Sequence, residues 1–295
     1  MFFSRHTARI LAKLKRQYLT SANEPSRLEM RARNIDYVRN ALPGWAGGRE
    51  ENITDSLSRL GTWHGINGIA ALEGGALEDG WTLIHTAWLY EALALRLHIS
   101  RFQKQRGLGP FGWPRSLERE ASSVALCLAY GQVFKREFEV SFFGDALRVM
   151  LLDTTVVPDE YWQYHHLEPF LVQLLALARG EVLNLARDYR RSLGPYQAII
   201  DRWGDADGLR EALFAACEYH CQRMEDESEE FRAEFIAAPF DVVPAEIMAV
   251  YAVRRELGLA TPEVDHPLYK APYVCPVGSP ADISDELLDQ VEREF

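Results

Sequence analysis

The sequence predicts an all-α protein. Apolar residues return every three or four positions through most of the 295-residue chain, which is the spacing of one face of an α-helix. Short segments rich in Gly and Pro separate these periodic stretches, and helices end where such residues stand. We therefore expect a single multi-helix domain over residues 1–295, an irregular helical bundle with Gly/Pro-rich connecting loops.

The N-terminal half predicts four helices. Three follow from apolar periodicity and run from Ile10 to Tyr18, from Trp81 to Leu95 and from Val124 to Phe134. A fourth is expected after Pro25, with Ser26 as its cap and Glu29 three residues on as the capping partner, and with its end at Pro43 and the glycines that follow. The periodic stretches are long enough for each to bury one face.

The C-terminal half predicts four more helices, at about 168–192, 209–237, 245–258 and 282–294. In the third, Pro244 stands near the start, and Gly258 stands at the end, where a left-handed C-cap favours Gly. The fourth has Asp282 or Ser284 as its expected cap and acidic residues in its first turn, which the helix dipole stabilises.

Two segments interrupt the helical spacing. Gln105–Ser116 holds three Gly and two Pro in twelve residues, so we expect a loop that bridges two halves or covers a surface. Asp153–Trp162 is β-branched and contains Pro, and it is expected to be a second connection. A domain boundary near 105–116 is the alternative to one continuous domain.

The composition is that of a soluble globular protein, with 47% hydrophobic and 25% charged residues. The longest apolar runs, such as Phe170–Ala178, reach about half the roughly 20 residues of a membrane span. The N-terminus lacks the separate apolar block of a secretory signal, and the four cysteines do not resemble a disulfide framework. We expect a cytoplasmic protein that does not enter membranes.

The negative charge is unevenly distributed. The formal net charge is −11, and residues 1–40 hold nine Lys/Arg against three Asp/Glu, so the other 255 residues carry −17. An acidic body of this size repels nucleic acid and lipid surfaces and favours a basic partner. The alternative interpretation is that the charge serves only solubility.

One segment offers possible metal ligands. In a helix Cys217, His220 and Cys221 would share a face and could supply up to three zinc ligands. A structural zinc site needs four ligands, and no second Cys/His cluster lies close in the sequence. We therefore expect neither a metal nor a cofactor, and we interpret the two cysteines as small core residues.

Five carboxylates follow directly in a run of six residues: Glu225, Asp226, Glu227, Glu229 and Glu230. Paired carboxylates on one helical face, such as Asp226 and Glu230, could hold Mg²⁺ in an all-α enzyme, but the aspartate-rich motif of isoprenoid synthases is absent. The run could also be a solvated helix face, the usual position of such charges. The third interpretation is a docking surface for Lys and Arg of a partner.

Other candidate chemistry has a structural interpretation. His165 and His166 are adjacent and would point to different faces, so we interpret them, with Glu168, as packing residues. No nucleophile elbow, phosphate loop or dinucleotide-binding glycine pattern occurs. The glycines near His64 are expected to allow close helix approach or a turn. We expect no enzymatic activity.

The residues after Gly258 should follow an extended path. Pro262 and Pro267 keep their neighbours out of helix. We interpret His266 as a hydrogen-bonding residue that fixes this path against the helix carrying Arg254 and Arg255. Its predicted role is structural.

The segment Pro244–Leu268, with "PAEIMAVYAVRRELGL" followed by "PEVDHPL", resembles the C-terminal part of bacterial immunity proteins, in particular the immunity protein 49 family of polymorphic toxin systems. The resemblance implies a largely helical, cytoplasmic protein of interbacterial competition. Such a protein binds a cognate toxin domain and occludes its active site, and it catalyses no reaction itself. An all-α metal-dependent enzyme with carboxylates around Asp226, and a helical scaffold or regulator, are the alternatives.

Toxin inhibition would need apolar anchors as well as charge, because charges mainly set association rate and specificity. The predicted partner-binding residues are therefore the five carboxylates of 225–230 together with Tyr161 and Trp162. Three further aromatic residues are candidate anchors if they are exposed: Trp113, Tyr164 and Trp203.

Overall fold

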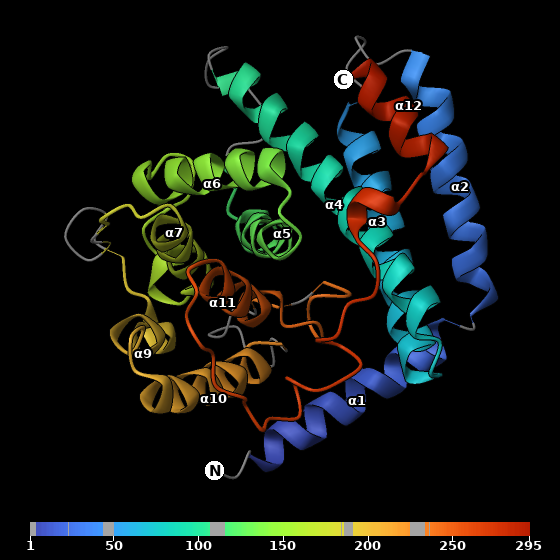
Figure 1. Cartoon of the computed structure of the whole chain (residues 1–295). Helices are drawn as coiled ribbons and strands as arrows, with labels where there is room; N and C mark the ends of the chain where they lie inside the picture. The colour runs from blue at the N-terminus through green and yellow to red at the C-terminus, as the bar shows by residue number, and fades with distance from the viewer. Residues whose placement is uncertain are drawn as a thin grey trace. The chain divides into compact units, whose positions relative to one another are not determined.

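The computed structural model describes residues 4–22, 24–43, 50–106, 116–183, 185, 191–224, 234–235 and 237–295. In these residues it contains eleven α-helices, three short 3-10 helices and no strand, so the predicted all-α class is confirmed (Figure 1). None of the helices described combines the length and the apolar character that a bilayer span requires.

The chain packs as two compact units. Unit 1 comprises Met1–Leu11, Arg115–Ile236 and Phe240–Val274, and unit 2 comprises Ala12–Pro114, Ala237–Pro239 and Cys275–Phe295. Each unit is thus assembled from segments that are far apart in the sequence.

One division between the units falls between Pro114 and Arg115, inside the segment Gln105–Ser116. Residues 107–115 of the predicted loop lie outside the described residues, and Gln105 and Arg106 are the last residues of a helix. The expectation of one domain over residues 1–295 stays a prediction.

Unit 1 is built around three helices whose side chains are almost all buried. They are α5 (Ala121–Val133), α7 (Leu167–Ala178) and α11 (Ala245–Glu256), and each contacts the other two (Figure 1). A helix that is apolar all round requires neighbours on every side. α6 (Glu137–Leu152) packs on α5 and α7, and α10 (Ala206–Gln222) packs on α11.

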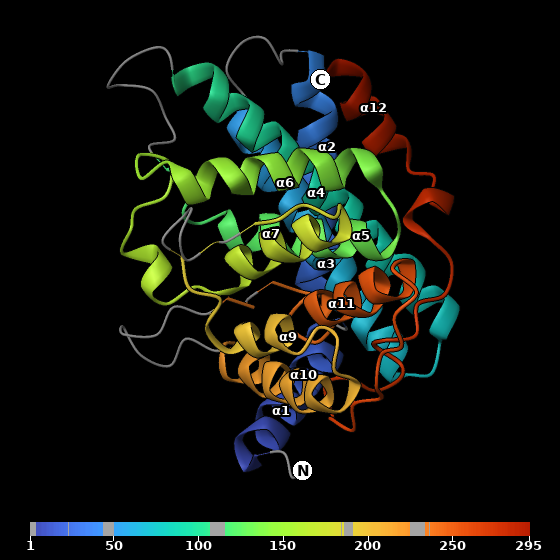
Figure 2. The same ribbon diagram turned by 60° about the vertical axis from the view of Figure 1, so that its left-hand side comes forward.

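Shorter elements complete unit 1. η2 (Tyr161–Gln163) ends the turn-rich connection after α6, as the interrupted pattern at 153–162 predicts. η3 (Gly194–Tyr196) leads directly into α9 (Gln197–Asp201), which lies beside α10 (Figure 2). α1 (Arg5–Ser21) begins in unit 1 and ends in unit 2.

Two predicted helices are shorter than expected. The helix predicted over 168–192 ends at Ala178, because Gly180 adopts a positive φ of 66° and its N–H bonds back to the carbonyl of Leu177. The helix predicted over 209–237 is α10, which ends at Gln222.

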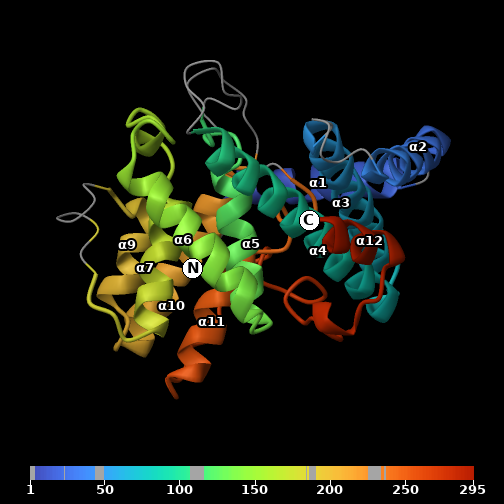
Figure 3. The same cartoon turned by 90° about the horizontal axis from the view of Figure 1, so that it is seen from above.

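Unit 2 is built on a pair of long helices. α3 (Glu50–Glu73) and α4 (Leu77–Arg106) lie side by side. α2 (Pro25–Ala41) packs on α3, while α12 (Glu286–Glu294) and η4 (Pro280–Asp282) contact α4 (Figure 3). Their buried apolar residues form one core of Val38, Ala41, Leu42, Ile53, Leu57, Leu60, Tyr90, Leu93, Ala94, Leu97, Leu287, Leu288 and Val291.

Glycines allow α3 and α4 to approach closely. A Cβ at Gly61 would lie 3.1 Å from the carbonyl oxygen of Ala87, and a Cβ at Gly68 would lie 2.8 Å from the side chain of Ile84. Gly75, in the turn between the helices, has a φ of 84°, which favours glycine. The predicted close approach and the predicted turn are both present.

The cap of the last helix differs from the expected one. Asp285, not Asp282 or Ser284, precedes α12 in an extended conformation. Its carboxylate accepts hydrogen bonds from the backbone N–H of Leu287 at 2.9 Å and of Leu288 at 3.2 Å. Asp282 instead ends η4, so the predicted helix begins four residues too early.

Candidate functional site

The acidic run that the sequence predicts to bind a partner lies outside the described residues. It consists of Glu225, Asp226, Glu227, Glu229 and Glu230. α10 ends at Gln222, three residues before the run begins. The partner-binding role of these carboxylates therefore stays a prediction.

The two predicted aromatic anchors, Tyr161 and Trp162, are interior residues. Each is only 4% exposed. The Tyr161 hydroxyl donates to Glu168 Oε1 at 2.5 Å, and its ring stacks on His165 with 3.7 Å between ring centroids. Trp162 has the guanidinium of Arg191 over its ring at 5.3 Å. Both rings are used for internal packing, so in this structure neither presents a surface to a partner.

The other aromatic candidates differ in exposure. Tyr164 is 50% exposed, which suits an anchor. Trp203 is half-buried, and the guanidinium of Arg254 lies over its ring at 5.1 Å. Trp113 lies outside the described residues.

Cys217, His220 and Cys221 share the inner face of α10, and all three are buried. Burial raises the pKa of both thiols well above the usual range, which disfavours the thiolate form that metals require. In the described parts of the chain, no group of three or more His, Cys, Asp or Glu side chains could hold a metal ion. The interpretation of the cysteines as core residues is confirmed.

His220 joins α10 to α11 through a buried carboxylate. Its Nε2 lies 3.2 Å from the backbone carbonyl oxygen of Asp241 and donates to it. Its Nδ1 lies 2.8 Å from Glu246 Oε1, so this contact needs a further proton, on the ring or on the carboxylate. Either arrangement fixes the register of the two helices in the core of unit 1.

Glu234 is the centre of a second buried group. Its Oε1 accepts hydrogen bonds from the Tyr219 hydroxyl at 2.7 Å and the His166 backbone N–H at 2.9 Å, and Arg223 lies 3.7 Å away. Its Oε2 is buried without a hydrogen-bond partner among the residues described. Burial, then the charge of Glu168, raises the pKa of Glu234 to about 8.

Glu168 accepts from two hydroxyls, those of Tyr161 at 2.5 Å and Ser122 at 2.8 Å.

The neighbouring histidines, His165 and His166, diverge, as predicted. His165 Nδ1 contacts the carbonyl oxygen of Tyr161 at 2.9 Å, and His166 Nδ1 contacts that of Ser192 at 3.2 Å. Burial lowers the pKa of both imidazoles, so both favour the neutral form.

His266 has a structural role, although its partner is not the predicted one. Its Nδ1 accepts from the Leu268 backbone N–H at 3.1 Å, so Nε2 carries the proton and donates to Glu218 Oε1 at 2.8 Å. Glu218 also accepts from the Thr7 hydroxyl at 2.9 Å and from the Ser4 N–H at 3.3 Å. His266 thus fixes the extended segment against α10, not against α11.

Arg254 of α11 holds the start of the same extended segment. Its guanidinium donates to the carbonyl oxygen of Ala260 and to the Thr261 hydroxyl, the latter at 3.2 Å. It also donates to the carbonyl oxygen of Trp203, which ties down the residues between α9 and α10. The extended segment after Gly258 is therefore held near its start by Arg254 and near its end by His266, both of which are buried.

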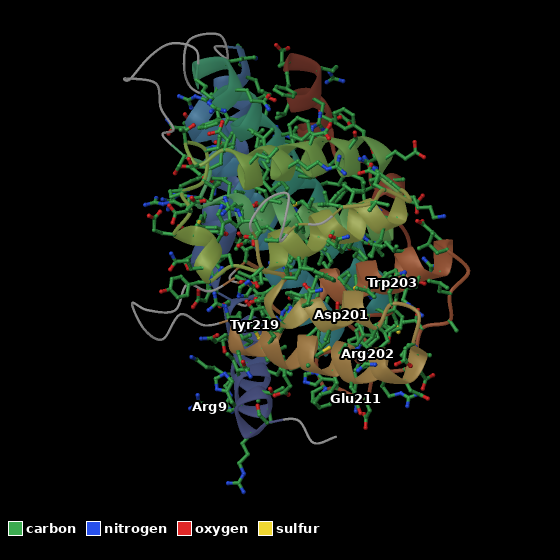
Figure 4. The ribbon with its side chains drawn as sticks, turned by 90° about the vertical axis from the view of Figure 1, so that its left-hand side faces the viewer. Arg9, Asp201, Arg202, Trp203, Glu211 and Tyr219 are labelled. Atoms are coloured by element: carbon green, nitrogen blue, oxygen red, sulfur yellow. The ribbon has the colours of Figure 1, made fainter. Side chains whose placement is uncertain are left out.

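Exposed acidic residues at the start of α10 alternate with arginines. Asp205 caps the helix and lies 3.4 Å from Arg202, and Asp207 lies 3.6 Å from Arg210. Glu211 is exposed on the same helix, and Figure 4 labels it together with Arg202. Residues 201–211 hold four acidic residues and two arginines, so this edge of α10 keeps a net charge of only −2 and gives a basic partner limited attraction.

The excess negative charge belongs to unit 1 as a whole. Its segments hold 27 Asp/Glu and 18 Lys/Arg, whereas those of unit 2 hold 16 and 14. The predicted acidic run is part of unit 1. A basic partner would therefore be attracted to unit 1 more strongly than to unit 2.

Sequence reasoning missed three carboxylates that bond to residues distant in the sequence. Glu218 bonds His266, 48 residues away, Glu246 bonds His220, 26 residues away, and Glu234 bonds Tyr219, 15 residues away. One signal was present: Glu246 stands in the apolar run "VVPAEIMAVYAV", where a carboxylate must find a buried partner.

Comparison with known proteins gave no match: no family model, no curated protein sequence and no solved structure is significantly similar to this chain.

Proposed function

We propose that this chain is an inhibitory binding protein, an immunity protein that neutralises a cognate bacterial toxin in the cytoplasm by covering its active site. The observation that carries the proposal is the concentration of negative charge in unit 1, with 27 acidic against 18 basic residues. Enzymes that act on nucleic acids or nucleotides have basic clefts, which attract and orient an acidic protein. The resemblance of Pro244–Leu268 to immunity proteins supplies the class of partner.

The use of the buried and half-buried histidines of unit 1 supports binding over catalysis. His165 and His166 bond to backbone carbonyl oxygens, and His220 and His266 bond to buried or half-buried carboxylates. In unit 1 these side chains connect helices and loops instead of lining a surface at which a substrate could exchange protons. These bonds tie the segments of unit 1 together before any partner binds, and such preorganisation lowers the entropic cost of forming an interface.

The test is co-expression with the C-terminal domain of the protein encoded immediately upstream. We expect the chain to restore growth of bacteria that produce this domain, and the two proteins to co-purify at a constant ratio. Circular dichroism of the purified chain establishes that it is folded. A folded, expressed chain that neither restores growth nor co-purifies with the domain would contradict the proposal.

Charge reversal tests the predicted acidic surface in the same complex. The triple variant Glu225→Lys, Asp226→Lys and Glu229→Lys should slow association about tenfold or more at low salt, since steering depends on the charge near the interface. Stopped-flow fluorescence measures the rate.

The matched control changes the net charge equally but on unit 2. Three exposed residues suit it: Asp36→Lys, Asp55→Lys and Glu294→Lys. The control should associate much faster than the first variant. Equal rates for the two variants would mean that net charge alone matters, and would remove the 225–230 run as the contact surface.

A further inference from the structure

α6 has apolar side chains on two opposite faces. The inner face, with Phe143, Leu147 and Met150, is fully buried in unit 1. The outer face is also apolar, although it is open to solvent. We call its residues the outer stripe: Phe138, Phe142, Asp145, Val149 and Leu152.

The outer stripe is a continuous strip along the helix. At 3.6 residues per turn its five positions fall within about 80° of arc, because they are spaced by four, three, four and three residues. Phe138 is 57% exposed, Val149 44% and Leu152 61%, and the rings of Phe138 and Phe142 stack with centroids 6.3 Å apart. Single exposed apolar residues are normal on a protein surface, but a row of four on one helix marks an interaction site.

One exposed apolar residue follows a segment that is paired to α6. Arg148 of α6 pairs with Glu181, which brings the segment after α7 against α6. The next residue, Val182, is fully exposed. The outer stripe itself has two aromatic side chains, Phe138 and Phe142, of the kind that anchor many interfaces.

Charge decides which kind of partner fits the outer stripe. Asp145 is exposed at its midpoint, and Glu137 is exposed beside its first residue. An apolar partner surface without a cation would bury the Asp145 carboxylate uncompensated, which is costly. We propose that the outer stripe is the docking surface for a partner protein whose contact face is apolar with a Lys or Arg near its centre.

Two other occupants fit less well. A second copy of the chain, paired antiparallel through α6 by a twofold axis, would place Asp145 against Asp145 at the middle of the interface, where like charges repel. A bilayer with anionic lipids would repel Asp145 in the stripe and Glu137 beside it, since peripheral helices use Lys and Arg for that contact. The basic protein partner is the occupant that the charge selects.

The inference rests on the proposed function only in taking the occupant to be a protein. The probe is a synthetic amphipathic helical peptide of about 20 residues with a Leu face that carries a Lys at its centre, compared with the same peptide carrying Glu for Lys. Fluorescence anisotropy measures binding to the full-length chain. We expect the Lys peptide to bind about tenfold or more tightly than the Glu peptide at low salt.

Substitutions locate the binding. Leu152→Asp and Val149→Asp should each weaken the Lys peptide about tenfold, and Asp145→Asn should weaken it less while reducing its salt dependence. The matched control is Leu28→Asp on α2, because Leu28 is 60% exposed against 61% for Leu152. The control should bind like the wild type.

Several results would overturn the inference. If the two peptides bind equally, or if Leu152→Asp binds the Lys peptide as tightly as the wild type does, the stripe does not select a basic partner. A dimer in solution that Leu152→Asp dissociates would show that a second copy occupies the stripe. Vesicle binding that Leu152→Asp abolishes would show that a bilayer occupies it. The co-expression experiment separates the two proposals. If the wild type and Leu152→Asp restore growth equally, the outer stripe is not the docking surface, but the proposed inhibitory function stands. If the wild type fails to restore growth, the inhibitory function is wrong, and the peptide measurements alone then test the outer stripe.

Discussion

At the scale of single residues, His266 connects three segments through its two ring nitrogens. Nδ1 accepts from the Leu268 N–H, which holds the extended segment in its turn, and Nε2 donates to Glu218 on α10. Glu218 in turn accepts from Thr7 at the start of α1. Since the imidazole is fully buried, a lost bond is not replaced by water.

We expect His266→Ala to lower the free energy of unfolding by about 2 kcal/mol, because two buried hydrogen bonds are lost and a cavity is left. His266→Gln retains a donor toward Glu218 and should lose less. Urea denaturation followed by circular dichroism measures both variants. An alanine variant as stable as the wild type would show that the His266 contacts add nothing to stability.

The role of His266 could be predicted from the sequence, but its partner could not. Pro262 and Pro267 indicate an extended path that needs fixing, and a His between them is a natural donor. The partner, Glu218, lies 48 residues away, and local spacing contains no information on such a pair. The same limit applies to Tyr161 and Trp162, whose burial depends on residues of several helices.

At the scale of elements, α12 begins with a cap that also bonds to α4. Asp285 accepts from the N–H groups of Leu287 and Leu288, and the Tyr90 hydroxyl of α4 donates to both of its carboxylate oxygens at 3.0 Å. The cap thus fixes where α12 starts and how it docks on unit 2.

Asp285→Ala should lower the free energy of unfolding by about 2 kcal/mol, of which the cap contributes about 1 and the buried partner of Tyr90 the remainder. Asp285→Asn retains a capping oxygen and should cost less. Chemical denaturation monitored by the loss of helical circular dichroism tests this. A loss as large for asparagine as for alanine would indicate that the charge, and not the cap, stabilises this end.

The positions of most described helices are predicted from the sequence, and helix ends are predicted less well. The apolar period places α4, α5 and α11 correctly, because it depends only on which side chains face a core. The choice among Asp282, Ser284 and Asp285 depends on which residue is extended, which the period does not determine. The predicted helices do not include α3 or α6. On α6 both the buried face and the outer stripe are apolar, so the helical period is less distinct there.

At the scale of the whole molecule, acidification affects groups in the two units with opposite sign. Burial, with a smaller contribution from Arg31, lowers the pKa of His64 in unit 2 from 6.5 to about 4. Burial and the charge of Glu168 raise the pKa of Glu234 in unit 1 from 4.5 to about 8. A group whose pKa is lowered by folding stays unprotonated in the folded chain at a pH where it is protonated in the unfolded chain, so acid favours unfolding. A group whose pKa is raised by folding binds a proton more readily in the folded chain, so acid favours folding.

The sign of each contribution follows. The stability contribution of His64 is complete above about pH 6.5 and falls as the pH drops toward 4, by ~2 kcal/mol between about pH 7 and pH 5. The contribution of Glu234 is complete below about pH 4.5 and is lost as the pH rises through 8. Between pH 7 and pH 5 the two effects therefore oppose each other in the intact chain.

Variants separate the two effects. In the folded chain the His64 and Tyr90 ring centroids lie 5.4 Å apart, and His64→Phe keeps a ring in this place. Because Phe binds no proton, the free energy of unfolding of this variant should fall by ~2 kcal/mol less than that of the wild type between about pH 7 and pH 5. Glu234→Gln removes the stability that protonation of Glu234 adds as the pH falls, so this variant should lose more stability in acid than the wild type. Urea titrations at the two pH values measure all three proteins. If all three respond alike, the folded chain must let water reach both groups, because shielding from water is the largest cause of each shift.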